Sequence, residues 1–556
     1  MNAPAPMPEI KRYTGVMDWL TTVDHKKIGL MYFWFVATMA IVGGALAGGI
    51  RLQLAMPGAV LEALNAAQLS GSNLPMNLFS ENRHLYNQIL TMHASVMIFF
   101  VIIPGFVAFS NHVVPLMIGA RDMAFPKMNA FGFWLLIPAA VLMFASFLVK
   151  GGAAASGWTA YPPLSLNGAG TDPGQDMWIM GVHLVGVSSI LAAINFIVTI
   201  ANMRAPGMTW GKLPLFAWAT FFTSIIMLLA TPVLAAAVTM VLMDRNFGTT
   251  FTIASQGGDP ALYQHVFWVY SHPAVYIMII PGFGAISHII SAFSGKRVFG
   301  YTGMVWAIGS ITVVGFMVWA HHMFTIGMPT QLQAYFMYAS LVIGVPTGIK
   351  VFSWLATMWG GNIRFTTPMK FALGFISTFT LGGFGGLVLA MVPTDITLHD
   401  SYFVVGHFHM VLVGGSTMLL MGMAYYWWPK MSGRMLNEKV GSVVFWLMLC
   451  GVFLCFIPMH IVGAEGMARR VPVYYSDFKF LNHLATGGYL LTFLSASIFF
   501  LQLVFSYRRP PLLINDPWEI NDLQQSFEWA TASPPPVYNF EVVPPIPVVD
   551  QAPTHH

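Results

Sequence analysis

Residues 261–290 read ALYQHVFWVYSHPAVYIMIIPGFGAISHII, an apolar run that is long enough to cross a bilayer and yet contains polar side chains. His272 and Tyr276 are four residues apart, so a helix places them on one face, one turn apart, and Pro273 between them can bend that helix. A histidine at this depth is either a hydrogen-bonded packing residue or a ligand. This stretch alone leaves both interpretations open.

The composition indicates a membrane protein. Of 556 residues, 56% are hydrophobic and 8% are charged, against about 25% charged residues in an average soluble protein. The two cysteines, Cys450 and Cys455, share one apolar run, which suits neither a disulfide framework nor a thiolate metal site. We therefore expect an all-α polytopic membrane protein whose partners include the lipid bilayer and no nucleic acid.

Apolar windows of about 20 residues, enough to span the hydrocarbon core, predict twelve transmembrane helices. They lie near 28–50, 86–112, 130–150, 176–202, 214–243, 261–290, 300–324, 332–358, 370–392, 400–428, 440–463 and 480–507. Most of the 25 lysines and arginines fall on the side of the N-terminus, so both termini are predicted to be cytoplasmic. The chain thus divides into a cytoplasmic segment 1–27, a membrane domain 28–507 and a proline-rich cytoplasmic tail 508–556.

Adjacent histidines lie near the end of the seventh predicted helix, in VWAHHMF. His321 and His322 differ by about 100° around a helix, so both can reach one ion only if the helix end is distorted. Together with His272 they would form a set of three imidazoles, which suits copper. The alternative is a polar helix end that faces water.

A second pair, in DSYFVVGHFHMVL, is spaced differently. His407 and His409 point about 200° apart on a helix, so they cannot share one metal, but each can face a separate haem. His93, in LTMHASVMIFF on the second helix, could oppose one of them across its haem. Six buried histidines in this grouping favour metal binding over independent packing roles.

Six motifs of the chain resemble subunit I of the haem–copper oxygen reductases, in the cytochrome c oxidase branch: MHASVMIFF, YSHPAVY, WAHHMF, TGIKVFSW, HDSYFVVGHFHMV and ARR. The resemblance extends from about Asp24 to the prolines of the tail. It implies twelve transmembrane helices that enclose two haems and a copper. It also implies a terminal respiratory oxidase that reduces O2 to water with electrons from cytochrome c, coupled to proton uptake and pumping.

The resemblance implies the metal ligands. They are His93 and His409 for the low-spin haem iron (haem a), His407 for the high-spin haem iron (haem a3), and His272, His321 and His322 for the copper. Tyr276 matches the family tyrosine that is covalently linked to the copper-ligating histidine one turn away and that supplies an electron and a proton for cleaving the O–O bond.

Residues on the outer side match further family contacts. Paired guanidiniums suit the carboxylates of haem propionates, and other positions match a haem a contact, a tryptophan above the propionates and the ligands of a redox-inactive magnesium. Arg469 and Arg470 are the paired guanidiniums, and Arg51 matches the haem a contact. Trp158 matches the tryptophan above the propionates, and His399 with Asp400 matches the magnesium ligands. Without the family, all of them are also plausible as interfacial or loop packing residues.

Buried ionisable residues mark the expected proton routes. By resemblance the K pathway consists of Ser287 near its entrance, then Thr347 and Lys350, and ends at Tyr276. Asp122 resembles the entrance of the D pathway, and its polar lining matches Asn111, Asn129 and Asn195. Read without the family, Asp122 is an ordinary loop carboxylate.

The chain departs from most relatives at one position. They carry a glutamate directly after the His-Pro of the sixth helix, where this chain has Ala274. Tyr270 and Ser271 precede His272, and this YSHP arrangement resembles the subgroup in which a tyrosine and a serine replace the glutamate. We therefore expect these two hydroxyls to carry the proton relay.

Two alternatives remain beside this reading. A twelve-helix transporter predicts no haem, and a quinol-oxidising haem–copper oxidase would carry an Arg and an Asp on the first helix and a His before the second. Here these places hold Val42, Leu46 and Leu85. A nitric oxide reductase is not among them, because it would be expected to lack Tyr276 and Lys350, and this chain has both.

The predicted partners follow from what the chain does not carry. It holds no cluster of Cys, His and Met for a dinuclear copper, so a separate subunit II is expected to provide one. Subunit III and small subunits, cytochrome c or a similar donor, and O2 complete the expected partners. The expected location is the bacterial inner membrane.

Overall fold

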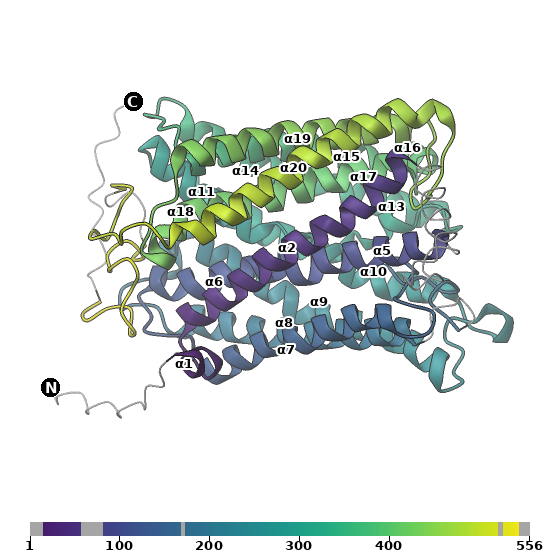
Figure 1. Ribbon diagram of the computed structural model, residues 1–556, viewed down its shortest axis with the longest axis horizontal. Coiled ribbons are helices and arrows are strands. Elements are labelled where there is room, and N and C mark those ends of the chain that lie inside the picture. Colours follow the sequence, from purple (N-terminus) through teal and green to yellow (C-terminus); the bar gives the residue numbers. More distant parts are fainter. Residues whose placement is uncertain (1–14, 57–81, 168–172, 521–525, 544–556) are drawn as a thin grey trace, which may run out of the picture.

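The computed structural model describes residues 15–56, 82–167, 173–520 and 526–543, which form a bundle of long, roughly parallel helices (Figure 1). Eleven helical segments of the described chain are long and apolar enough to cross a membrane, and a twelfth, Tyr301–Met317, is shorter. The eleven are His25–Ala55, His84–Ile118, Pro126–Leu148, Gly174–Asn202, Leu215–Asn246, Pro260–Ser294, Thr330–Met358, Thr367–Ala390, Tyr402–Ser432, Glu438–Ala464 and Ser476–Ser506. Every predicted window overlaps one of these twelve segments.

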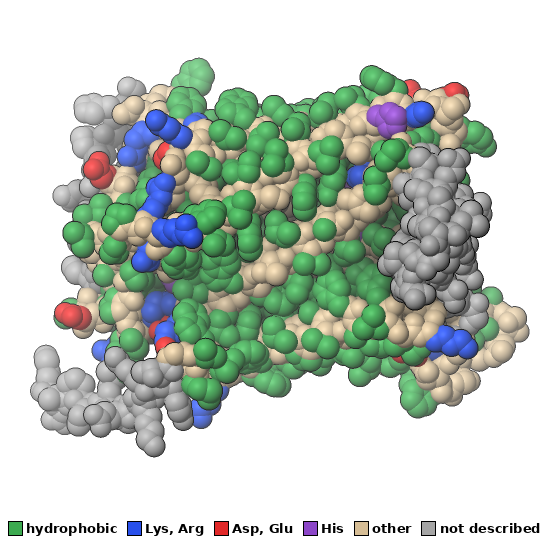
Figure 2. Space-filling view, in the orientation of Figure 1, with side chains coloured by type: hydrophobic (Ala, Val, Ile, Leu, Met, Phe, Trp, Pro, Cys, Tyr) green, Lys and Arg blue, Asp and Glu red, His purple; other side chains and the backbone are tan. Residues whose placement is uncertain are grey.

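The outside of the bundle is apolar across its middle, and Lys and Arg side chains gather at its two ends (Figure 2). Large hydrophobic side chains such as Trp306, Phe352 and Phe384 are exposed there, with 72%, 72% and 58% of their surface accessible. Such a surface is unfavourable in water and favourable against lipid tails, so the fold is that of a polytopic membrane protein.

Glycines let neighbouring helices approach closely. Helix α19 (Glu438–Ala464) runs along α20 (Lys479–Ser506), and Gly488 faces the backbone of Cys455. A Cβ at Gly488 would lie 2.2 Å from the Cys455 nitrogen, and one at Gly451 would lie 2.8 Å from the Thr492 nitrogen. Small residues at such contacts are the usual basis of helix packing in membranes.

Several spans are irregular next to the predicted ligands. Helix α5 (Asn82–Val96), which carries His93, continues into a π-helix, Met97–Ile102, before α6 (Ile103–Ile118). Helix α17 (Tyr402–Val411), which carries His407 and His409, likewise continues into a π-helix, Leu412–Thr417, and then α18 (Met418–Ser432). Single π-helical turns inside α-helices are frequent at functional sites.

The seventh span departs from the predicted window 300–324. Helix α12 ends at Val314, and the chain continues as 3₁₀ turns, Gly315–Met317 and Trp319–Met323. The adjacent histidines therefore lie on a tight 3₁₀ turn rather than on an α-helix, as the requirement for a distorted helix end predicted.

The described part of the tail packs against the end of the bundle where α1 (Val16–Leu20) and α18 lie, at the left of Figure 1. We call this the terminal end. The ammonium group of Lys430 donates hydrogen bonds to the carbonyls of Asn515, Thr531 and Ala532, at 3.2, 2.6 and 3.1 Å. The Trp518 indole N–H donates to the Tyr426 carbonyl at 2.9 Å. The described tail residues contain no helix or strand, so backbone and side-chain hydrogen bonds hold the tail in place.

A buried carboxyl makes the packing of this tail depend on pH. Burial raises the pKa of Glu528 from its ordinary value of 4.5 to about 7. The packed tail thus holds this proton more tightly than a released tail, so the stability of the packing falls as pH rises between these two values. Hydrogen exchange of residues 526–533 should become faster over that range, after correction for intrinsic rates, and Glu528→Gln should remove the dependence.

The matched control is Glu541→Gln, which changes an exposed carboxyl of the same tail. It should leave the pH dependence of exchange unchanged. If exchange in the Glu528→Gln protein kept the same pH dependence as in the unaltered protein, another group would be responsible.

Candidate metal centre

Three histidines meet where α10 (Pro260–Ile277) faces the 3₁₀ turn Trp319–Met323. One ring nitrogen from each of His272, His321 and His322 lies within 4.8 Å of the others. Nδ1 of His272 is 3.2 Å from Nε2 of His322. His272 is buried and the other two rings are half-buried, so three neutral imidazoles can offer their lone pairs to one ion.

Neighbouring side chains hold the rings of His321 and His322 in place. Nδ1 of His321 hydrogen-bonds the Ser340 hydroxyl at 2.7 Å, which leaves Nε2 for an ion. The Trp268 ring stacks on His322, with centroids 3.8 Å apart and planes 10° apart. Hydrogen bonds and stacking of this kind orient metal-binding imidazoles. The residues present thus fit a copper ion, and Trp268 is a contributor that the sequence pattern did not reveal.

Tyr276 lies beside His272, as their spacing predicts. The two ring centroids are 4.7 Å apart and their planes make an angle of 64°. Nε2 of His272 is buried and has no hydrogen-bond partner among the described residues. Gly315 makes room for the tyrosine, because a Cβ at that position would lie 2.9 Å from its Cδ2.

A second site lies between α5 and α17. The rings of His93 and His409 are nearly parallel, at 7°, with centroids 6.3 Å apart. Nδ1 of His93 bonds the Gly43 carbonyl and Nδ1 of His409 bonds the Val405 carbonyl, both at 2.9 Å, so each ring keeps Nε2 available. This separation accommodates one iron with metal–nitrogen distances of about 2 Å on each side, which fits an axial pair.

His407 points away from that pair, as predicted from its spacing. Its Nδ1 bonds the Gly382 carbonyl of α15 (Thr367–Ala390) at 2.8 Å. A Cβ at Gly386 would lie 2.8 Å from Cε1 of His407, so glycine at this position lets the helix approach the ring. Because Nδ1 is engaged, Nε2 of His407 is the nitrogen that can bind a separate haem iron.

The predicted propionate residues form a buried basic group. The Arg470 guanidinium donates to the Thr159 hydroxyl at 3.3 Å, and its Nε is buried without a partner among the described residues. Burial lowers the pKa of Arg470 to about 10. Arg469 lies 3.5 Å from the Asp400 carboxylate, and the Trp158 ring packs 5.3 Å from Phe267. Unpaired buried guanidinium nitrogens suit anionic partners such as carboxylates.

Arg51, near the end of α2 (His25–Ala55), is buried and engaged on one side. One of its terminal nitrogens donates to the Asn482 carbonyl at 2.6 Å. The other, NH1, is buried without a partner among the described residues, so it can still receive an oxygen of a bound group.

The predicted magnesium ligands include a partner that the sequence reasoning missed. Nδ1 of His399 lies 3.1 Å from the Asp395 carboxylate, and Nε2 lies 4.0 Å from that of Asp400. Burial lowers the pKa of His399, but the hydrogen bond and charge of Asp395 outweigh it, so the pKa is raised overall. The i, i+4 spacing of Asp395 and His399 is the signal that could have identified this pair.

The lysine of the predicted K pathway points into the bundle from α14 (Gly344–Met358). Lys350 has no accessible surface, and its Nζ has no hydrogen-bond partner among the described residues. It lies 5.2 Å from the ring of Phe283, a residue one helical turn before Ser287. Ser287 accepts a hydrogen bond from the Trp354 indole at 2.9 Å, and the Thr347 hydroxyl donates to the Ile343 carbonyl at 2.9 Å.

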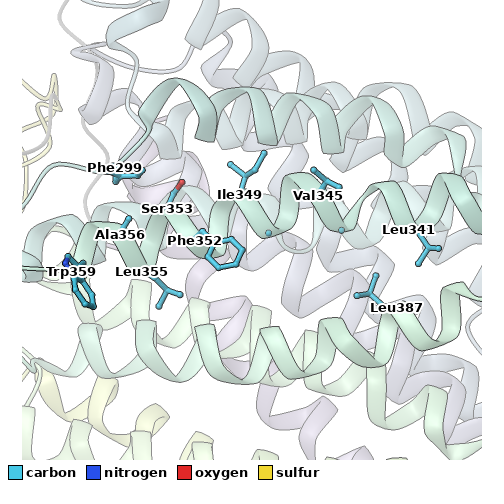
Figure 3. A pocket seen from close by; sticks show the side chains of 12 residues that line it. Phe299, Leu341, Val345, Ile349, Phe352, Ser353, Leu355, Ala356, Trp359 and Leu387 are labelled. Atoms are coloured by element: carbon cyan, nitrogen blue, oxygen red, sulfur yellow. The ribbon is translucent and has the colours of Figure 1, made fainter.

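The opposite face of α14 is apolar. Val345, Ile349 and Phe352 line an open groove of about 990 Å³ on the outside of the bundle (Figure 3). Since this groove faces the lipid, the lysine and the apolar residues divide the helix into an inner and an outer face.

The predicted D-pathway residues gather at the terminal end. The Asn195 carboxamide accepts from the Phe125 backbone nitrogen at 2.9 Å and donates to the Phe125 carbonyl at 3.2 Å. The backbone nitrogen of Asn129 donates to the same carbonyl at 3.0 Å. Oδ1 of Asn111 and Nδ2 of Asn129 are buried without partners among the described residues. Water molecules are the natural partners for such groups. Asp122 accepts from the Met123 nitrogen at 2.7 Å.

The residues that replace the family glutamate are buried on α10. Tyr270 is 4% exposed, Ser271 has no accessible surface, and Ala274 is 1% exposed. The Ser271 hydroxyl has no hydrogen-bond partner among the described residues, which leaves it able to bind water.

Removal of one ligand tests the copper site. Substitution His272→Ala should lower the copper content of the purified complex by one ion per chain, measured by elemental analysis, because two imidazoles hold the ion poorly. The control is His183→Gln, since His183 is also inside a span but is engaged by the Ile179 carbonyl and the Thr239 hydroxyl at 2.9 Å each. Equal copper content in both variants would contradict the site.

Comparisons with known proteins agree with this geometry. The family model described as cytochrome C and quinol oxidase polypeptide I matches residues 27–491. Cytochrome c oxidase subunit 1 of Thermostichus vulcanus is 44% identical over 546 residues, covering 98% of this chain and 94% of the relative. The subunit 1 of Cereibacter sphaeroides is 45% identical over 555 residues, covering 97% of each.

A solved structure shares the fold. The cryo-EM structure of a heme–copper terminal oxidase dimer has a chain that superimposes with a TM-score of 0.71 at 18% sequence identity. The match covers 88% of this chain and 85% of that one.

Proposed function

The chain belongs to the family of cytochrome c and quinol oxidase polypeptide I, and from this premise we propose how its own residues carry out the reaction of that family. The protein is the catalytic subunit I of a cytochrome c oxidase, a terminal oxidase that reduces O2. The observation that carries the assignment is near-full-length identity of 44–45% to such subunits, joined to a three-histidine centre and a parallel histidine pair.

The cofactor ligands follow from the available ring nitrogens. His93 and His409 hold the low-spin haem and His407 the high-spin haem, which we assign as haem a and haem a3. His272, His321 and His322 hold the copper. When bound, these groups supply the electron path and the place where O2 is reduced. Tyr276 beside His272 provides a phenol that can give up a proton and an electron there, and the proposal includes a covalent link between the two side chains.

The remaining site residues bind the polar substituents of the haems and a magnesium ion. Arg469, Arg470 and Trp158 receive the haem propionates, and Arg51 receives a polar substituent of haem a. His399 and Asp400 would hold a magnesium ion, with Asp395 fixing the imidazole.

Protons reach the centre through two polar routes in this proposal. Lys350 carries protons from Ser287 past Thr347 to Tyr276, and its buried amino group without a hydrogen-bond partner among the described residues supports this role. Asp122 admits protons to a second route lined by Asn111, Asn129 and Asn195, whose unpartnered buried atoms are suited to hold water. Tyr270 and Ser271 then replace the missing glutamate as the relay.

The donor and the assembly complete the proposal. The first helix has Val42 and Leu46 where quinol-oxidising relatives carry an Arg and an Asp, which supports cytochrome c as the electron donor. Subunit II supplies the dinuclear copper, with subunit III and small subunits alongside. The excess of lysine and arginine at the terminal end supports cytoplasmic termini in a bacterial inner membrane.

The donor is tested by the rate of O2 uptake in the purified complex. Reduced cytochrome c should sustain uptake that quinol cannot. Uptake from quinol alone would instead support the quinol-oxidising branch.

The two proton routes are tested by Lys350→Met and Asp122→Asn. Each removes a titratable group from one route, and positioned proton transfer contributes about 10²-fold or more, so turnover should fall by about that factor in each. The carboxamide introduced by Asp122→Asn keeps the size of the side chain, so its effect reports the lost proton. Unaltered turnover in Asp122→Asn would remove this residue from the route.

The relay is tested by the double variant Tyr270→Phe with Ser271→Ala. Proton pumping, measured as acidification outside reconstituted vesicles per electron, should be lost or strongly reduced because no hydroxyl remains at that depth. Ser495→Ala removes another buried hydroxyl, one that already donates to the Val444 carbonyl at 2.6 Å; it serves as control and should pump normally. Unchanged pumping in the double variant would show that the relay lies elsewhere.

A further inference from the structure

The carboxamide of Asn539 ties the tail to two other parts of the chain at the terminal end. Asn539 has no accessible surface. Its Nδ2 donates to the Ala120 carbonyl at 2.8 Å, in the loop after α6. Its Oδ1 accepts from Nζ of Lys26 at 2.9 Å, on the first turn of α2. One tail side chain therefore joins segments that lie 419 and 513 residues away in the sequence.

These two contacts fix which way the amide points. A carbonyl can only accept and an ammonium can only donate, so Nδ2 must face Ala120 and Oδ1 must face Lys26. Nδ2 then lies 2.9 Å from Nε2 of His25, while Oδ1 is farther from it, at 3.2 Å. The other nitrogen of His25, Nδ1, lies 2.6 Å from the Asn111 carbonyl. His25 therefore donates through Nδ1 and accepts from Asn539 through Nε2, as a neutral ring.

Asp122 lies two residues after Ala120, in the loop that Asn539 binds, and the charge of Lys26 acts on its carboxyl. Burial raises the pKa of Asp122, while the charge of Lys26 opposes that rise. The other titratable groups around His25 are Asp24, on the same turn, and His112 of α6. Asp122 thus keeps its proton to a higher pH as long as this cluster stays packed and partly dry.

We propose that Asn539 is a positioning residue for proton uptake, which holds the His25 ring in place and ties the loop of Asp122 to the tail. The tail is then part of the proton entrance as well as a cover over the bundle end. The inference rests on the proposed role of Asp122 as that entrance. Asn539 itself transfers no proton, since a carboxamide does not titrate in this range.

The test is Asn539→Ala in the full complex, with steady-state O2 uptake from reduced cytochrome c measured across pH. Loss of the Asn539 carboxamide should slow turnover near neutral pH by about fivefold, the factor that corresponds to one lost hydrogen bond of ordinary strength. Lys26 keeps its ion pair with Asp24 at 2.9 Å, so its charge stays in place when Asn539 is lost. Water that then reaches Asp122 reduces the effect of burial, and the alkaline decline of turnover should move to lower pH. Asn539→Asp adds a negative charge beside Asp122, so its decline should lie at higher pH than that of Asn539→Ala.

A control separates positioning from simple attachment of the tail. Trp518→Phe removes another tail hydrogen bond, to the Tyr426 carbonyl, while keeping the aromatic ring. It should leave both turnover and the pH profile as in the unaltered protein. Hydrogen exchange of residues 526–543 shows in each variant whether the tail is still packed.

The outcomes are distinguishable. A normal rate and pH profile in Asn539→Ala, alongside slow turnover in Asp122→Asn, would overturn the role of Asn539 and leave the entrance in place. The same shift in Trp518→Phe as in Asn539→Ala would reduce Asn539 to an anchor and also overturn the inference. Normal turnover in Asp122→Asn would instead remove the entrance on which the inference rests.

Discussion

A buried imidazole has two nitrogens, and the apolar interior of this bundle provides a protein partner for one of them at the key positions. His93, His407 and His409 each bond a backbone carbonyl through Nδ1, and His321 bonds a serine hydroxyl in the same way. The nitrogen that remains would be costly to leave unsatisfied in a dry interior. Metal ligation would satisfy it, and this supports the proposed haem and copper ligands.

The same reasoning applies to the proton routes. The amino group of Lys350, the hydroxyl of Ser271 and the amide oxygen of Asn111 are buried without protein partners in the described residues. In a chain that otherwise keeps its interior apolar, such groups are expected at water-filled paths. They lie on α14, α10 and α6, which approach the metal centre from the terminal end or from its flank.

Much of this could be predicted from the sequence. Hydropathy located the spans because the lipid requires about 20 apolar residues for each. Spacing alone predicted that His407 and His409 face apart, and that two adjacent histidines need a distorted helix end. The 3₁₀ turn and the two π-helices themselves were not predictable, because they depend on packing against neighbouring helices. Trp268 on His322 and Asn539 on His25 also escaped prediction, because these partners are distant in the chain and no local pattern marks them.

The account depends most on the claim that these histidines hold two different haems and a copper. The most direct measurement is the reduced-minus-oxidised visible spectrum of the purified complex, recorded with and without carbon monoxide. A low-spin haem that ignores carbon monoxide, together with a high-spin haem that binds it, is the predicted result, since the proposal assigns two histidines, His93 and His409, to one iron and His407 alone to the other. A spectrum with a single kind of haem, or with none, would contradict the account.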